Sequence, residues 1–91
     1  MSRYAVKCLS SDMSVEIEEF DSLREACEDA IDITRTTTKS DRPMACAEFA
    51  EVYDMDEDPE MRKTLLWSGR RGVETDIKED DPRYEEIKKF L

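Results

Sequence analysis

Chemistry in this chain has to come from carboxylates or thiols, because the sequence contains no histidine. Histidine is the usual base of catalytic triads and Cys–His pairs, since its pKa lies near neutrality. The three cysteines, Cys8, Cys27 and Cys46, form no CxxC pair, whereas a structural zinc site takes about four Cys or His ligands. An odd number of cysteines without disulfide spacing is typical of reduced thiols, buried as small apolar residues. We therefore expect a protein that is not an enzyme and that holds no metal ion and no cofactor.

The carboxylates are numerous and unevenly placed. The chain of 91 residues has 24 acidic and 14 basic side chains, which gives a formal charge of −10. Residues 12–32 hold nine acidic side chains and one basic one, and residues 48–60 hold seven acidic side chains and no basic one. This balance argues against direct binding to nucleic acid or to anionic membranes, because both need clustered Lys and Arg.

The apolar residues are too scattered for a membrane protein. No stretch approaches the roughly 20 apolar residues that a membrane helix needs. The N-terminus lacks the basic and then apolar pattern of a signal peptide. We therefore expect a cytoplasmic protein, which would lie in the host cytoplasm if a phage encodes it.

Four carboxylates within the first acidic block have the spacing of a helix face. Glu25, Glu28, Asp29 and Asp32 lie at positions i, i+3, i+4 and i+7, away from the apolar face that begins at Leu23. The row is about 10 Å long, and its like charges destabilise the helix by about 0.2–0.5 kcal/mol per pair. It predicts either a solvated face that keeps the protein soluble or a surface that imitates a row of phosphates.

Two further groups of carboxylates support a binding surface. Glu16 and Glu18 project from the same side of a strand, and an acidic turn follows residue 53. The residues that we predict to bind a partner are Glu16, Glu18, Glu25, Glu28, Asp29, Asp32, Asp54, Asp56, Glu57 and Asp58. The turn also resembles the opening of a calcium loop, but Pro59 and Leu65 stand where that loop needs Gly and Glu. Weak binding of a divalent ion stays open.

The apolar pattern predicts the elements that must position these carboxylates. We expect strands at residues 3–9, 15–18, 45–54 and 62–68, a helix at 22–36, a loop at 70–80 and a short helix at about 82–90. The helix is capped by Asp21 or Ser22, and Asp81 caps the last helix before Pro82. The result is a single α+β domain over residues 1–91, with a β-β-α-β-β core module at 3–68 and an extension at 69–91. Its antiparallel sheet packs on one helix.

The alternation of side chains also predicts which faces are buried. In the strand at 15–18, apolar and acidic residues alternate, and we expect Val15 and Ile17 to face the core. In the strand at 45–54, one face carries Ala50 and Val52 and the other carries aromatic residues, so the pattern does not decide which face is buried.

A weak pattern of mostly structural motifs resembles a recurring small module. The strand ending in Phe-Asp-Ser-Leu at 20–23, the helix with Glu25-Ala26, and the later Val-Tyr-Asp at 52–54 and Leu-Trp-Ser at 66–68 carry this resemblance. Modules of this layout are similar to small accessory proteins of phages and mobile elements. Some acidic proteins of that size and origin are anti-CRISPR or other anti-defence inhibitors. The resemblance implies binding to complexes that handle nucleic acid, and no catalytic residue can be transferred from it.

The leading hypothesis is a non-enzymatic acidic protein-interaction module. It would bind a basic groove of a nucleic-acid-binding protein or ribonucleoprotein complex and inhibit it by mimicry of DNA or RNA. The alternative is a homo-oligomeric scaffold or a small-molecule-binding protein, possible as a homodimer through a strand edge or the face formed by Tyr84, Ile87 and Leu91. A small metal-assisted enzyme is a third class, and it would need a tightly bound ion.

Overall fold

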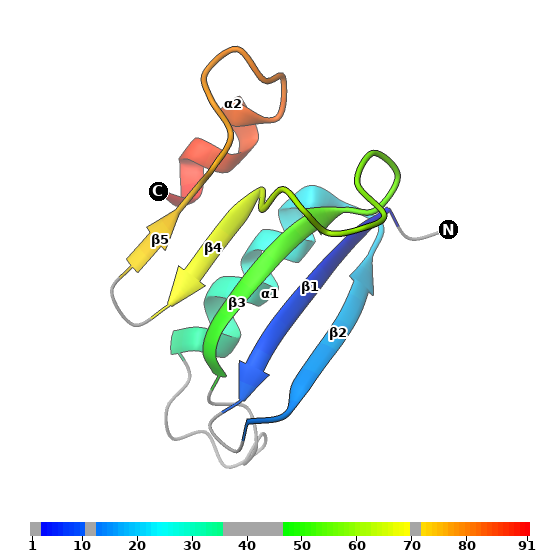
Figure 1. Cartoon of the computed structure of the whole chain (residues 1–91). Coiled ribbons are helices and arrows are strands. Elements are labelled where there is room, and N and C mark those ends of the chain that lie inside the picture. The colour runs from blue at the N-terminus through cyan, green and yellow to red at the C-terminus, as the bar shows by residue number, and fades with distance from the viewer. Residues whose placement is uncertain (1–2, 11–12, 36–46, 70–71) are drawn as a thin grey trace.

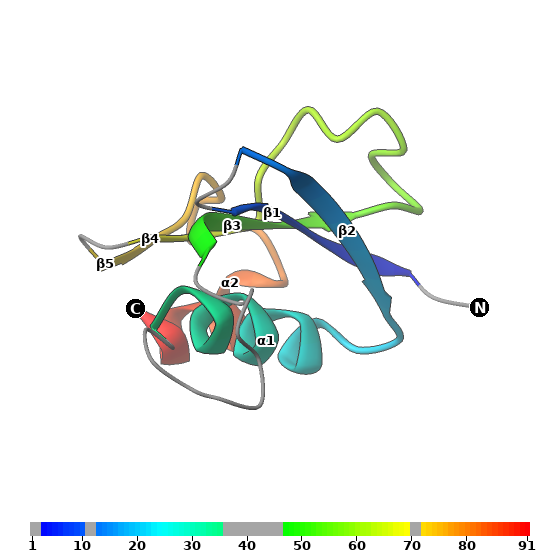
Figure 2. The same cartoon turned by 90° about the horizontal axis from the view of Figure 1, so that it is seen from below.

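The computed structural model describes residues 3–10, 13–35, 47–69 and 72–91 (Figure 1). The elements in chain order are β1 (Tyr4–Ser10), β2 (Val15–Phe20), α1 (Leu23–Arg35), β3 (Ala47–Asp54), β4 (Leu66–Gly69), β5 (Gly72–Glu74), α2 (Tyr84–Ile87) and the 3₁₀ helix η1 (Lys88–Phe90). The strands form one antiparallel sheet in the order β2-β1-β3-β4-β5. Figure 2 shows α1 and the C-terminal helices on the same side of this sheet. The expected α+β class is confirmed.

The helix α1 matches its prediction closely. It begins after Ser22, whose hydroxyl oxygen accepts a hydrogen bond from the backbone N–H of Glu25 at 3.1 Å. This contact satisfies one of the backbone donors that a helix leaves free at its N-terminus. No helix in the described ranges is long and apolar enough to cross a membrane.

The C-terminal region differs from its prediction in two ways. Part of the expected loop at 70–80 is the strand β5, which pairs with β4 through Trp67↔Glu74 and Ser68↔Val73. A strand of three residues is too short to show an alternating pattern, so the sequence gives no signal for it. The last helix is also shorter than expected, because α2 begins at Tyr84 and changes to a 3₁₀ helix after Ile87.

Asp81 still organises the start of α2, although it is not the residue that flanks the helix. Its carboxylate accepts the backbone N–H of Arg83 at 2.9 Å, and its carbonyl oxygen accepts the N–H of Tyr84 at 2.9 Å. Pro82 therefore lies in a turn before α2 rather than at the first helical position.

The prediction for β2 is wrong about the direction of its side chains. The register places Glu18 opposite Val6, which faces α1, and Ile17 opposite Lys7 on the other face of the sheet. Ile17 is 57% exposed and Val15 is 54% exposed. The physical reason is that the register puts Val15 and Ile17 on the face of the sheet opposite α1, at its edge strand. Alternation reveals the period of a strand, and only the sheet reveals which side is covered.

The core lies between α1 and the central strands. Its fully buried members include the small residues Ala26, Ala30 and Ala50, which let the helix approach the sheet closely. Ala50 and Val52 are both 0% exposed, so this is the covered face of β3. The other face carries Phe49, which is half-buried, and Tyr53, which is buried. The segment at 55–64, light green in Figure 2, stands on this second side of the sheet, opposite α1.

The C-terminal helices belong to the same core. Ile87 is 0% exposed, and Tyr84 and Phe90 pack against the core cluster. Of the face that we expected to be available for self-association, only Leu91 is well exposed, at 54%. Most of this face is therefore packed within the chain, and self-association through it stays a prediction.

Candidate functional site

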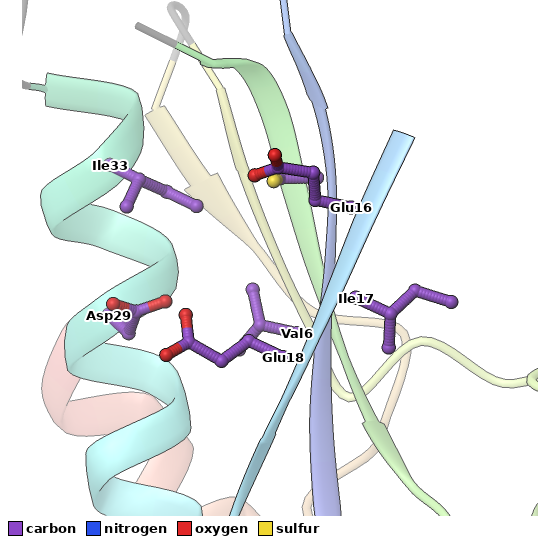
Figure 3. A pocket seen from close by; sticks show the side chains of 7 residues that line it. Val6, Glu16, Ile17, Glu18, Asp29 and Ile33 are labelled. Atoms are coloured by element: carbon purple, nitrogen blue, oxygen red, sulfur yellow. The ribbon is translucent and has the colours of Figure 1, made fainter. Parts of the chain in front are cut away.

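Three of the predicted site residues meet at a groove between β2 and α1. Glu16 and Glu18 point from β2 towards the helix, and Asp29 points from α1 towards the strand (Figure 3). The groove has a volume of about 410 Å³ and is lined by Val6, Cys8, Glu16, Ile17, Glu18, Asp29 and Ile33. No basic side chain is among these lining residues. We call this site the acidic groove.

The local fold explains why these carboxylates converge. In β2 the register puts Glu16 beside Cys8 and Glu18 beside Val6, both on the side of the sheet that α1 covers. Asp29 immediately precedes the fully buried Ala30, at the flank of the apolar face of the helix. Because α1 packs over the central strands, a hollow remains between its flank and the edge strand, and acidic residues border it on both sides.

The thiol in the groove is not suited to nucleophilic chemistry. Burial raises the pKa of Cys8, and the negative charges of Glu16 and Asp29 raise it further. Burial raises the pKa of Cys27 to about 12. Since the thiolate is the reactive form, both cysteines are protonated at neutral pH and react poorly. The third predicted thiol, Cys46, lies outside the described residues.

The carboxylate row on α1 is divided between two surfaces. Asp29 borders the acidic groove, whereas Glu28 and Asp32 line a different hollow of about 350 Å³ together with Lys89. Glu28 also accepts a hydrogen bond from the Arg24 guanidinium at 2.8 Å. The division arises because residues at these spacings span about 100° around a helix, which is wide enough to face two neighbours.

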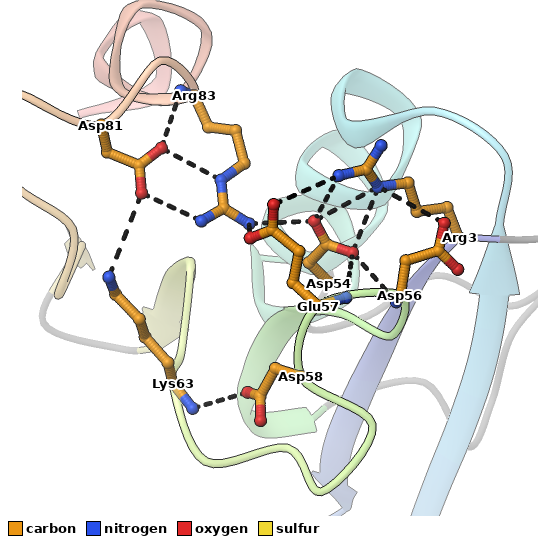
Figure 4. Close-up of polar contacts among 8 residues, drawn as sticks. All are labelled: Arg3, Asp54, Asp56, Glu57, Asp58, Lys63, Asp81 and Arg83. Atoms are coloured by element: carbon orange, nitrogen blue, oxygen red, sulfur yellow. Dashed lines mark hydrogen bonds and ion pairs between the residues drawn. The ribbon is translucent and has the colours of Figure 1, made fainter.

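The acidic turn after β3 forms a third group, and its first residue is structural. The side chain of Asp54 is 2% exposed and pairs with Arg3 and Arg83, each at 2.9 Å (Figure 4). It also accepts the backbone N–H of Asp56 at 3.0 Å. In this structure Asp54 is therefore buried and used within the fold, and its predicted contact with a partner stays a prediction. The segment at 48–60 contains no basic residue, but arginines that are distant in the sequence pair with its carboxylates in the fold.

The other acidic residues of the turn pair with Arg3 or with backbone N–H groups of the same segment. The side chains of Asp56 and Glu57 are 68% and 60% exposed, and both lie within 4 Å of Arg3. Asp58 accepts the backbone N–H groups of Arg62 at 3.0 Å and Lys63 at 2.7 Å. The carboxylates of the segment that resembles a calcium loop thus already pair with guanidinium and backbone N–H groups. In the described ranges, no group of three or more Asp, Glu or Cys side chains is arranged to hold a metal ion.

The segment at 55–64 stands on the side of the sheet opposite α1 (Figure 2). The acidic groove lies on the α1 side, so the turn and the groove do not form one continuous surface. The fold collects Glu16, Glu18 and Asp29 at one site and leaves the other predicted residues around α1 and beyond β3. Arg3 and Arg83 were missed entirely, since they contact Asp54 from 51 and 29 residues away and no spacing rule connects them.

The arginine cluster makes stability depend on pH at the acidic end. Hydrogen bonds from Arg83 lower the pKa of Asp81 from its usual 3.8 to about 2. For Asp54, burial alone would raise the pKa, but hydrogen bonds from Arg3 and from backbone N–H groups lower it overall. A carboxyl group with a lower pKa in the folded state stabilises the fold above its unfolded pKa, and this contribution is lost as pH falls through the folded value.

We therefore expect the free energy of unfolding to decrease as pH falls from about 4 to about 2. Urea titrations at constant ionic strength across this range measure it. The variant Asp81→Asn should show a smaller decrease, because one of the titrating groups is gone. An equal decrease in the variant and the parent would contradict the assignment to Asp81.

The open face of the sheet carries an apolar surface that the sequence did not reveal. Phe49 and Trp67 stack with ring centroids 6.4 Å apart and an interplanar angle of 25°. Val15 and Ile17 lie on the same face of the sheet, at its β2 edge. The indole of Trp67 lies over Gly69, where a Cβ atom would overlap the ring.

Gly69→Ala should therefore displace the Trp67 side chain and lower the free energy of unfolding by about 1–3 kcal/mol. Trp67 is the single tryptophan of the chain, so its fluorescence spectrum reports the displacement directly. Gly72→Ala is an instructive comparison, because no atom lies near its Cβ position but its φ of 131° disfavours any side chain. It should destabilise the fold without the same change in fluorescence. An unchanged spectrum for Gly69→Ala would contradict this contact.

Comparison with known protein families, with curated proteins and with solved structures found no match to this chain. What the chain can do therefore has to be argued from its own surfaces. Among them, the acidic groove brings carboxylates of two separate elements, β2 and α1, to the two sides of one hollow.

Proposed function

We propose that this chain is a non-enzymatic acidic protein-interaction module that binds the basic nucleic-acid-binding surface of a host protein or ribonucleoprotein complex. By occupying that surface it excludes DNA or RNA and inhibits the complex. The observation that carries this proposal is the acidic groove, where Glu16 and Glu18 on one side face Asp29 on the other and the described residues that line the hollow include no basic one.

The two borders of the groove have a geometry that suits mimicry of nucleic acid. Glu16 and Glu18 are two residues apart on a strand, which separates them by about 7 Å along its axis. Across the hollow, Asp29 of α1 faces them (Figure 3). Negative charge on both sides of a hollow resembles, on a small scale, phosphates bordering a groove.

The charge of the chain supports fast and selective association. A formal charge of −10 attracts a basic partner over a distance and repels acidic proteins and nucleic acid itself. Such steering increases the association rate and makes it sensitive to salt, since ions screen exposed charges. The described thiols are held in their protonated form, which favours a binding role over covalent catalysis.

The proposal is tested by affinity capture from a nuclease-treated cell lysate with three forms of the immobilised chain. These are the parent, the groove variant Glu16→Lys with Glu18→Lys, and the control variant Glu74→Lys with Asp76→Lys. The control makes the same change in net charge at exposed residues beside the opposite edge of the sheet.

We expect the parent and the control to capture the same protein, identified by mass spectrometry, and the groove variant to lose it. The captured protein should bind nucleic acid and should be released by added DNA or RNA. Capture that persists in the groove variant, or that depends equally on the control positions, would contradict the proposal.

A further inference from the structure

The edge of the sheet at β2 is open to a partner. In the sheet order β2-β1-β3-β4-β5, the strand β2 pairs only with β1, at least within the part of the chain that the structure describes. Every second residue of such a strand directs its N–H and C=O groups away from the sheet, where another strand can bind them. Unlike β5, which has three residues, β2 has six and is long enough to hold an added strand.

The two faces of this edge differ in their chemistry. Figure 3 shows Glu16 and Glu18 on the side of β2 that faces α1, and Ile17 on the other side. On the side of the open sheet face, Ile17 and Val15 are 57% and 54% exposed. The side chains of a strand added beside β2 alternate between the two faces of the sheet. Those on the α1 side would meet carboxylates, and those on the other side would meet apolar groups.

We infer that the β2 edge binds an extended segment of the partner in which basic residues alternate with apolar ones. The backbone of this segment pairs with β2, and its Lys or Arg side chains enter the acidic groove and meet Glu16, Glu18 and Asp29. Its apolar side chains cover Val15 and Ile17. Backbone pairing supplies affinity, and the alternating side chains supply specificity. This inference rests on the proposed function and specifies how the acidic groove recognises its partner.

Charge complementarity selects this occupant over a second copy of the chain. If β2 paired with β2 of another copy, Glu16, Glu18 and Glu19 of both chains would meet across the new strand pair. Like charges directly opposite in a sheet are destabilising. A net charge of −10 on each copy adds to this repulsion. The same negative charges that disfavour self-association attract a basic segment.

Two labelled peptides of the same composition test the inference. In the first, about seven residues alternate between Lys and Val, and in the second the Lys residues are grouped at one end. Affinity is measured by fluorescence anisotropy, and hydrogen exchange of the β2 amides is followed by NMR. We expect the alternating peptide to bind at least about tenfold more tightly, since only it can pair with the strand and also match both faces.

Binding should slow the exchange of alternate β2 amides. The groove variant Glu16→Lys with Glu18→Lys should lose the preference for the alternating peptide, and the control variant Glu74→Lys with Asp76→Lys should keep it. Equal affinity for the two peptides, or no change in β2 exchange, would overturn strand addition. The lysate capture above would still decide separately whether the acidic groove binds a basic partner. Binding of neither peptide would also overturn the inference.

Discussion

Ile87→Ala is expected to lower the free energy of unfolding by about 3–4 kcal/mol, the largest loss that we expect from a single substitution. Ile87 is 0% exposed and belongs to the same apolar cluster as Leu65, Leu66 and Ile77. Alanine would leave a cavity in this cluster and remove the buried apolar side chain of α2. A helix of four residues has no stability of its own, so its position depends on this packing.

Urea unfolding followed by circular dichroism measures this loss, with Leu91→Ala as the control. Leu91 is 54% exposed, so its truncation should change stability by less than about 0.5 kcal/mol. Limited proteolysis adds a local measurement, because the Ile87 variant should be cut more readily near the C-terminus. A variant as stable as the parent would show that the C-terminal helices do not belong to the core.

Arg83→Met is expected to lower the free energy of unfolding by about 3 kcal/mol at neutral pH. Arg83 binds both Asp81 and Asp54, each at 2.9 Å, and the Asp54 side chain is only 2% exposed. Methionine keeps much of the aliphatic volume but removes the guanidinium. The buried carboxylate of Asp54 would then keep only one of its two arginine partners, Arg3, and Asp81 would lose the partner that lowers its pKa.

The matched control is Arg24→Met, which removes an exposed arginine paired with Glu28 at i,i+4. Pairs of this kind contribute about 0.3–0.5 kcal/mol, so the control should be close to the parent. The difference between the two variants should shrink as the pH approaches 2, because protonated carboxyl groups no longer need the guanidinium. Equal losses in both variants at neutral pH would contradict a structural role for the cluster.

The spacing of apolar residues predicts an element correctly where that element packs one face against the core. The apolar residues of α1 recur at helical spacing, and the helix spans Leu23–Arg35 against an expected range of 22–36. The same reasoning placed β1 and β3, since both lie in the middle of the sheet. In each case local pattern and tertiary packing agree, which is why a single sequence suffices.

Prediction from sequence was wrong where position in the sheet decides the outcome. Val15 and Ile17 were expected to be buried, but β2 is an edge strand and both side chains are exposed. The error also reversed the direction expected for Glu16 and Glu18, which turn towards α1 and form the acidic groove. No local feature of the sequence specifies that a strand lies at an edge.

Asp54 illustrates a second limit. In the sequence it is one more carboxylate of an acidic turn, and in the structure it is the buried centre of an arginine cluster. Its partners, Arg3 and Arg83, lie immediately before β1 and α2, so only the folded chain brings them together. Acidic residues therefore lie both inside this fold, as Asp54 does, and at its surface.

The central claim is that the acidic groove and nucleic acid compete for the same surface of a partner. The most direct test uses the captured protein loaded with fluorescently labelled DNA or RNA and follows anisotropy while this chain is added. We predict that the parent and the Glu74→Lys/Asp76→Lys control displace the nucleic acid, and that the Glu16→Lys/Glu18→Lys variant does not. Simultaneous binding of the chain and the nucleic acid to the partner would contradict the claim.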